Sequence, residues 1–116
     1  MEVPFVDFKK QYDPIRGEID DAIKSVVDDY YFVYGHALRK FEAEFANFIG
    51  TKFCVGVGSG TDALVLSLMS IRDSLGDKTE VIVPDLTFSA TLNAVIMAGL
   101  DPVVIDSNKS TFCIFK

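Results

Sequence analysis

The residues with the clearest chemical potential form a short glycine-rich turn, Gly58-Ser59-Gly60-Thr61. An apolar run at 53–57 precedes it and an apolar-periodic segment follows it, so we expect the turn to join a strand to a helix. Glycines let backbone N–H groups approach a ligand, and a helix start offers unpaired N–H groups and partial positive charge. The turn therefore predicts a phosphate site, although a plain turn in which Ser59 or Thr61 only caps the helix fits equally well.

Two better-known phosphate loops fit these residues less well. The P-loop requires a Lys directly after its last glycine, whereas Thr61 stands there. The dinucleotide fingerprint G-x-G-x-x-G has only a partial counterpart in Gly56, Gly58 and Gly60. Its acidic residue at the end of the next strand has a candidate in Asp85. A nucleotide-binding domain is therefore an open alternative.

A second group of candidate residues, Pro84 to Thr91, follows the apolar run 81–83. If 81–83 is a strand of a parallel sheet, these residues lie at its carboxyl end, where open α/β sheets bind ligands. Phe88 stands at the start of the following helix, so its ring has the position to lie against a flat ligand. Core packing is the alternative role for Phe88.

The elements that position these residues follow from apolar periodicity and from capping and breaking residues. Helices are expected at about 13–29, 36–49, 62–75 and 87–98, and strands at 53–57, 81–83 and 102–105, with extended segments at 3–8 and 111–115 and an aromatic connection at 30–35. Asp13-Pro14 is expected to open the first helix, with Asp13 as its cap. The strand order βαβαβ and the continuous apolar strands predict a three-layer α/β domain with helices on both faces. We expect a helical segment over 1–51 and an incomplete α/β domain over 52–116.

The composition narrows the class of protein. With 17 acidic and 11 basic residues and a net charge of −6, the chain lacks the basic surface that nucleic-acid binding needs. No apolar run reaches the roughly 18 residues of a membrane span, and the sequence has no signal-peptide pattern, so we expect a cytoplasmic protein. Cys54 and Cys113 are expected to be reduced core residues, and they predict no metal site. His36, the single histidine, is expected to be a solvated residue at a helix start.

Several landmarks together resemble the N-terminal part of the DegT/DnrJ/EryC1/StrS aminotransferases. They occur in the family's order: Pro4 to Tyr12, Gly35 with Phe41 to Phe45, Ser59 to Leu64, Val81 to Pro84 with Thr87 to Thr91, and Ala98 to Asp106. The resemblance implies part of the large domain of a fold-type I enzyme that uses pyridoxal 5'-phosphate (PLP). It also implies amino transfer from Glu or Gln to a nucleotide-linked keto-sugar, by a homodimer.

Carried over by position, the resemblance assigns cofactor binding to four residues of this chain. Gly60, Thr61 and Asp62 would hold the PLP phosphate through N–H groups and the Thr61 hydroxyl, and Phe88 would stack on the pyridine ring. The segment 30–35 would lie near the substrate entrance and the subunit interface. The opening Pro4-Phe5-Val6-Asp7 favours enzymes that act at C3 of the sugar over those that act at C4.

No catalytic residue is assigned to this chain. Transamination by PLP needs a Lys that forms a Schiff base and an acid paired with the pyridine nitrogen. The resemblance places both beyond residue 116, and none of the Lys residues in the sequence occupies the family's Lys motif. We therefore expect the chain to correspond to about the first third of such an enzyme and to be inactive alone. A phosphate- or nucleotide-binding α/β module without catalysis is the alternative function.

Overall fold

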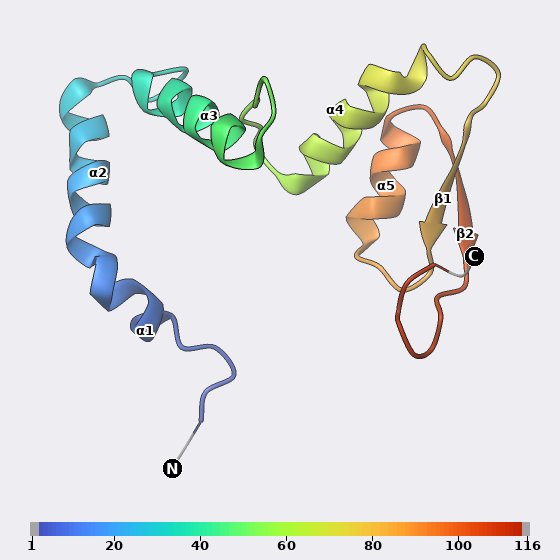
Figure 1. The fold of residues 1–116 in the computed structure, drawn as a ribbon, viewed down its shortest axis with the longest axis horizontal. Coiled ribbons are helices and arrows are strands. Elements are labelled where there is room, and N and C mark those ends of the chain that lie inside the picture. Colours follow the sequence, from blue (N-terminus) through green and yellow to red (C-terminus); the bar gives the residue numbers. More distant parts are fainter. Residues whose placement is uncertain (1–2, 115–116) are drawn as a thin grey trace. The chain divides into compact units, whose positions relative to one another are not determined.

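The computed structural model describes residues 3–114 and has a mixed α/β architecture (Figure 1). The chain forms two compact units, with the boundary after Gly56. The described part of the first unit is helical. The second unit contains the strands, in the order helix, strand, helix, strand.

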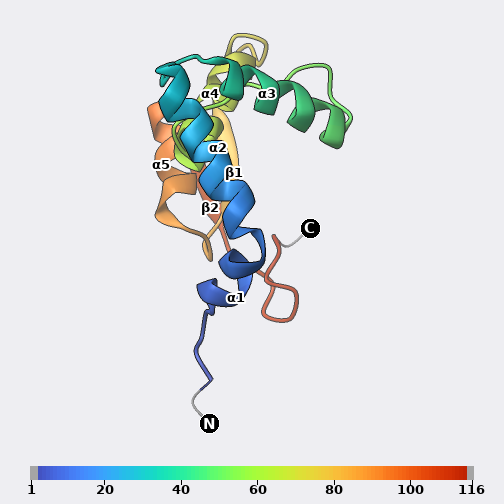
Figure 2. The same ribbon diagram turned by 90° about the vertical axis from the view of Figure 1, so that its left-hand side faces the viewer.

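The first unit begins with three helical elements that follow one another directly. They are α1 (Phe8–Tyr12), the 3-10 helix η1 (Asp13–Ile15) and α2 (Arg16–Asp29), and Figure 2 shows the change of direction between α1 and α2. Asp7 caps α1, because its carboxylate accepts a hydrogen bond from the Lys10 N–H at 3.2 Å. The predicted cap at Asp13 was therefore wrong: helical structure starts at Phe8, and Pro14 is tolerated because it lies in the first turn of η1.

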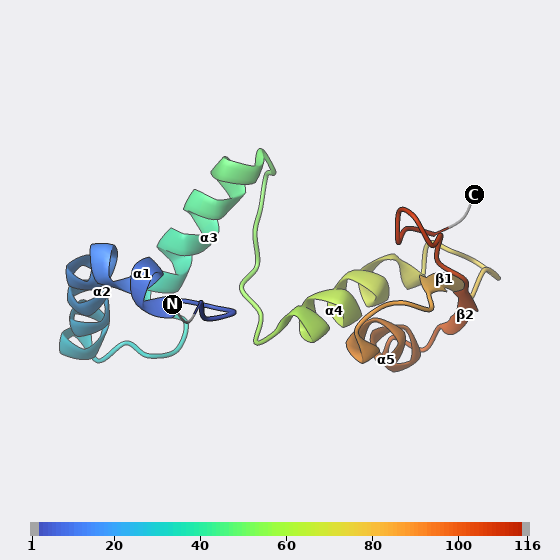
Figure 3. The ribbon, with the colours of Figure 1, turned by 90° about the horizontal axis from the view of Figure 1, so that it is seen from below.

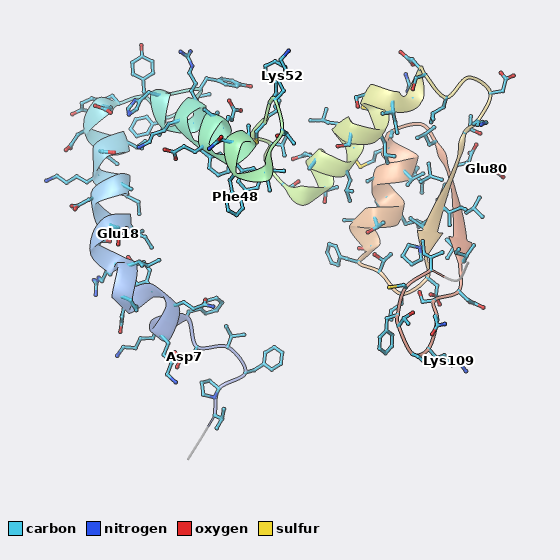
Figure 4. The ribbon with its side chains drawn as sticks, in the orientation of Figure 1. Asp7, Glu18, Phe48, Lys52, Glu80 and Lys109 are labelled. Carbon is cyan, nitrogen blue, oxygen red and sulfur yellow. The ribbon has the colours of Figure 1, made fainter. Side chains whose placement is uncertain are left out.

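Helix α3 (His36–Ile49) has the predicted bounds. Gly50 ends it with a left-handed φ of +80°, and its N–H donates to the Ala46 carbonyl at 2.9 Å. The apolar stripe of α3 lies largely in solvent: Phe41, Phe45 and Phe48 are exposed, and Ala46 is buried. Figure 4 labels Phe48 near the end of this helix. Within residues 3–114, no helix combines the length and hydropathy needed to cross a bilayer.

The second unit is built around a pair of parallel strands. Its elements are α4 (Gly60–Arg72), β1 (Glu80–Pro84), α5 (Ser89–Met97) and β2 (Asp101–Ile105). In the register of the strands, Val81 pairs with Pro102 and Pro84 with Ile105. Helices α4 and α5 lie on the same side of the strand pair (Figure 3). The buried cluster consists of Val83, Val95, Ala98 and Leu100, with Leu68, Leu75, Val81 and Leu92 packed against it.

Two features of the predicted three-layer βαβαβ domain are absent from the described residues. The segment 53–57 forms no strand, because a strand needs a neighbouring ladder and the Gly56 N–H donates instead to Glu42 Oε1 at 2.7 Å. The second absent feature is the predicted cover on both faces: in residues 3–114, the helices cover one face of the sheet (Figure 3). Ile82, which points away from the face that carries Val81 and Val83, is 60% exposed.

The last described segment is a tight turn rather than the predicted extended piece. The Phe112 N–H donates to the Asn108 carbonyl at 2.7 Å, and Ser107 and Ile114 form an isolated antiparallel bridge. Residue 115 of the predicted segment lies outside the described residues. The expectation that both cysteines are core residues was also wrong, since Cys54 is half-buried and Cys113 is exposed.

Candidate functional site

The N-terminus of α4 is capped by a reciprocal pair of hydrogen bonds. Ser59 has extended backbone, and its Oγ accepts from the Asp62 N–H at 3.1 Å. The Ser59 hydroxyl in turn donates to Asp62 Oδ2 at 2.9 Å. The predicted capping role of Ser59 is therefore confirmed, and this role orients the helix start without using every donor there.

The backbone N–H groups of Gly60 and Thr61 are the remaining hydrogen-bond donors at the start of α4. Within residues 3–114, neither backbone N–H donates to an acceptor of the chain, as expected for the first turn of a helix. Apart from its chain neighbours and the backbone of its own helix, nothing in the described part of the chain lies within 4 Å of the position that a Cβ on Gly60 would take, so the chain leaves space beside Gly60. The Asp62 N–H differs from them because Ser59 already engages it. The turn can therefore hold an oxyanion through Gly60 and Thr61.

The Asp62 carboxylate works against an anion at this helix start. Its Oδ2 lies 3.0 Å from the position that a Cβ on Gly58 would take, so a negative charge stands beside the turn. Like charges close together repel, and solvent weakens this repulsion at an exposed residue. A phosphate would therefore bind most tightly to the Gly60 and Thr61 side of the turn.

Phe88 lies at the start of the other helix of the unit. It is the N-cap residue of α5, and its carbonyl accepts from the Thr91 N–H at 2.9 Å. Thr87 Oγ1 and Thr91 Oγ1 lie 3.0 Å apart, so these hydroxyls also share a hydrogen bond across the first turn. The Phe88 side chain is 79% exposed, which rules out core packing as its role in this structure. An exposed ring is available as a surface for a flat ligand.

The two helix starts lie at the same end of the second unit. At the opposite end, Arg72 at the close of α4 donates to the Ala98 carbonyl just after α5, at 3.2 Å. Because α4 and α5 pack together with their C-terminal ends joined in this way, their N-termini point in the same direction. All four residues predicted for cofactor binding therefore belong to one end of the unit.

Asp85 and Ser107 form a polar contact at this same end. Asp85 Oδ1 accepts hydrogen bonds from the Leu86 N–H at 2.7 Å, the Ser107 N–H at 2.9 Å and the Ser107 hydroxyl at 2.7 Å. The Ser107 hydroxyl, and then the two N–H groups, lower the pKa of the Asp85 carboxyl from its ordinary 3.8, because they stabilise the charged form. Asp85 is therefore engaged within the chain. From the sequence, Asp85 was a candidate for the acidic residue of the dinucleotide fingerprint, and nothing in the sequence pointed to Ser107.

The aromatic segment 30–35 forms a distinct feature of the first unit. Tyr30 and Tyr34 both have left-handed backbone, with φ of 56° and 52°. Together with His36 and Arg39, part of this segment lines a pocket of about 270 Å³. His36 lies at a helix start in solvent, as predicted, and its Nε2 is 3.4 Å from Asp29 Oδ2. The pocket offers phenol, imidazole and guanidinium groups to a polar ligand.

Comparison with known proteins identifies the family. Residues 13–116 match the model of the DegT/DnrJ/EryC1/StrS aminotransferase family. The chain belongs to this family. The match covers the second unit and the first unit from Asp13 onward.

Several curated relatives are similar to the chain over most of its length. One is the UDP-N-acetyl-3-dehydro-alpha-D-glucosamine 3-aminotransferase of Acidithiobacillus ferrooxidans, 43% identical over 90% of the chain and 28% of the relative. A second is the dTDP-3-amino-3,4,6-trideoxy-alpha-D-glucose transaminase of Streptomyces venezuelae, 43% identical over 92% of the chain and 28% of the relative. A third is the UDP-2-acetamido-2-deoxy-3-oxo-D-glucuronate aminotransferase of Pseudomonas aeruginosa, 34% identical over 95% of the chain and 30% of the relative.

The similarity to these relatives covers only part of their length. The chain spans less than a third of the length of each of these relatives. The part of the chain that matches the family model, residues 13–116, contains the glycine-rich turn, Asp85, Phe88 and Ser107.

Proposed function

We propose that the chain supplies the PLP-binding turn and ring platform of an aminotransferase that acts on a 3-keto sugar attached to a nucleotide. The observation that carries the proposal is the 43% identity, over 90% of the chain, to a UDP-sugar 3-aminotransferase. The end of the second unit that gathers Gly60, Thr61 and Phe88 supports it, because a phosphate donor set and an exposed ring are what PLP requires. On this proposal, the second unit is part of a fold-type I large domain.

The residues present fit the cofactor. The N–H groups of Gly60 and Thr61, with the Thr61 hydroxyl, would hold the phosphate, and Asp62 would keep the helix start in place through its bond to Ser59. Phe88 would lie against the pyridine ring. The cofactor, when bound, supplies an electron sink for the carbon that loses or gains the amino group. The role of this chain's residues is to bind and orient it.

The position aminated is proposed from the names of the relatives. The Acidithiobacillus enzyme is named for a 3-dehydro sugar, the Streptomyces enzyme for a 3-amino sugar and the Pseudomonas enzyme for a 3-oxo sugar. These names agree with the C3 preference predicted from the opening Pro4 to Asp7. The first two name UDP and dTDP, respectively, as carriers, so we propose a nucleotide-linked substrate. Glu or Gln is the proposed amino donor.

Binding of pyridoxamine phosphate to the 116-residue chain tests the proposal. This probe has the phosphate and ring of PLP but no aldehyde, so it does not react with surface Lys residues. Titration calorimetry should show binding that Thr61→Ala and Phe88→Ala each weaken, the second by about tenfold, as expected for loss of a stacking ring. Phe112→Ala is the matched control, because Phe112 is also exposed but lies in the turn after β2.

The same titration distinguishes the proposed function from the alternative, a phosphate- or nucleotide-binding module without catalysis. A nucleotide- or phosphate-binding module would take uridine monophosphate as tightly as pyridoxamine phosphate, and Phe88→Ala would leave both affinities unchanged. This result would contradict the proposed cofactor. Added PLP with Glu and a keto-sugar should give no turnover by the chain alone, since none of its Lys residues matches the family's Lys motif.

The homodimer is proposed from the first unit. Residues 30–34 are five consecutive large side chains that are 65% to 80% exposed, a concentration of apolar surface typical of an interface. Analytical ultracentrifugation should show a dimer, and replacing Tyr31 and Phe32 with Ser should shift it toward monomer. A monomer at all concentrations would contradict the proposal.

A further inference from the structure

The carboxylate of Asp85 joins two loops that are distant in the sequence. Asp85 follows β1 directly, and Ser107 comes two residues after the end of β2. A single oxygen, Asp85 Oδ1, accepts from both polar groups of Ser107 at 2.9 Å and 2.7 Å. The Asp85 N–H donates to the Ile105 carbonyl at 2.9 Å and extends the ladder by one bond. The exits of the two strands are therefore tied together.

The segment that these bonds hold leads directly to Phe88. Asp85 Oδ1 also accepts from the Leu86 N–H at 2.7 Å, which fixes the backbone as it leaves the strand. Packing contributes little to this segment, because Leu86 is 62% and Phe88 is 79% exposed. Hydrogen bonds at Asp85 and at the first turn of α5 are what hold the connection between β1 and α5.

We propose that Asp85 is a positioning residue, which holds the connection between β1 and α5 so that the Phe88 ring is set for the pyridine ring of the cofactor. This inference rests on the proposed function. Asp85 touches neither the phosphate turn nor the proposed ring site, and it acts through the backbone of residues 86–88. The proposal therefore separates the two halves of the site: Asp85 affects ring binding and leaves phosphate binding unchanged.

Two probes and three variants test this separation. The probes are pyridoxamine phosphate and inorganic phosphate, titrated into the 116-residue chain. Asp85→Ala removes all three acceptor bonds, Asp85→Asn keeps an oxygen at the same place, and Ser107→Ala removes only the hydroxyl bond. Asp106→Ala is the matched control, because Asp106 is an exposed carboxylate one residue before Ser107. Circular dichroism and amide spectra by NMR establish that each variant is folded.

We expect the variants to lose affinity for pyridoxamine phosphate to different degrees and to keep their affinity for inorganic phosphate. Asp85→Ala should weaken pyridoxamine phosphate about fivefold to tenfold, close to the loss in Phe88→Ala, with Ser107→Ala intermediate and Asp85→Asn near the wild type. Inorganic phosphate should bind all variants equally. The NMR relaxation of the Phe88 amide, without ligand, should show greater motion in Asp85→Ala and recovery in Asp85→Asn.

Three outcomes overturn the proposal. Equal affinity of Asp85→Ala and wild type for pyridoxamine phosphate would show that the contact does not position the ring. Equal weakening of both probes would show a general structural effect. If the wild type bound neither probe, the proposed function and this inference would both be overturned. The wild-type titration alone reveals that case.

Discussion

The two units of the chain treat their apolar residues differently. Helix α3 of the first unit has a well-formed apolar stripe, yet Phe41, Phe45 and Phe48 are exposed and Ala46 is the hydrophobic residue it buries. The second unit buries Val83, Val95, Ala98 and Leu100 in one cluster between helices and strands. Helical apolar periodicity is in fact clearer in α3 than in α4 or α5, although α3 buries less of its apolar face. Periodicity identifies the face that requires a cover, and burial depends on whether another element of the chain lies against that face.

Truncation of a core side chain should give the largest contrast between the units. Leu100 is 4% exposed within the cluster, so Leu100→Ala removes buried methylene groups and leaves a cavity, at a cost of about 2–4 kcal/mol. Phe48→Ala removes a larger side chain that is 82% exposed, and its effect should stay within about 0.5 kcal/mol. Urea unfolding followed by circular dichroism measures both. A loss at Phe48 as large as that at Leu100 would show that α3 is covered in solution.

A pair of glycines in the first unit should respond in opposite directions to the same substitution. A Cβ on Gly35 would lie 2.5 Å from the Tyr31 carbonyl oxygen, so Gly35→Ala should destabilise the unit by about 1–3 kcal/mol. Gly17 lies inside α2 with no atom within 4 Å of its added Cβ, so Gly17→Ala should stabilise the helix by about 0.5–1 kcal/mol. Thermal unfolding of the two variants compares them directly. Changes of the same sign would contradict the described path of 31–35.

Loss of the cap at α4 should have a smaller effect, in the second unit. Ser59→Ala leaves the Asp62 N–H without its acceptor and should cost about 1 kcal/mol. Ser67→Ala, at an exposed position within the same helix, is the control and should change stability little. Ser59→Asp restores an acceptor and should recover most of the loss. If Ser59→Ala and Ser67→Ala were equally stable, the capping pair would not form in solution.

Much of the fold was predictable because local patterns determine it. The bounds of α3 followed from its apolar spacing and Gly50, and the apolar runs marked β1 and β2 to within two residues. The segment 53–57 had the same apolar character but formed no strand, because its backbone donors need a partner that composition does not reveal. A pattern of residue types therefore predicts an element well when the element is stabilised from within.

In the candidate site, too, the local hydrogen bonds were predictable from the sequence and the tertiary contacts were not. Ser59 and Asp62 are three residues apart, so their mutual bonds are a local property of a helix start. The exposure of Phe88 depends on what packs around it, and the contact of Asp85 with Ser107 spans 22 residues. That contact exists because the parallel register sets Pro84 beside Ile105. Register is a tertiary property, so the sequence could supply Asp85 as a candidate but not its partner.

The smallest expected effect is the pH dependence that Asp85 gives to the second unit. Bonds from Ser107 and Leu86 lower the pKa of the folded-state carboxyl below its ordinary 3.8, so their contribution is complete above that pH and disappears as the pH falls through the folded value. Asp85→Asn removes this pH-dependent contribution to the stability of the fold. Wild type should therefore be more stable than Asp85→Asn at neutral pH, and the difference should shrink below about pH 4. The effect is small because Asp85 is exposed and solvent weakens its interactions. Urea midpoints of both proteins from pH 7 to pH 3 measure it, and a constant difference would show that the charge of Asp85 does not contribute.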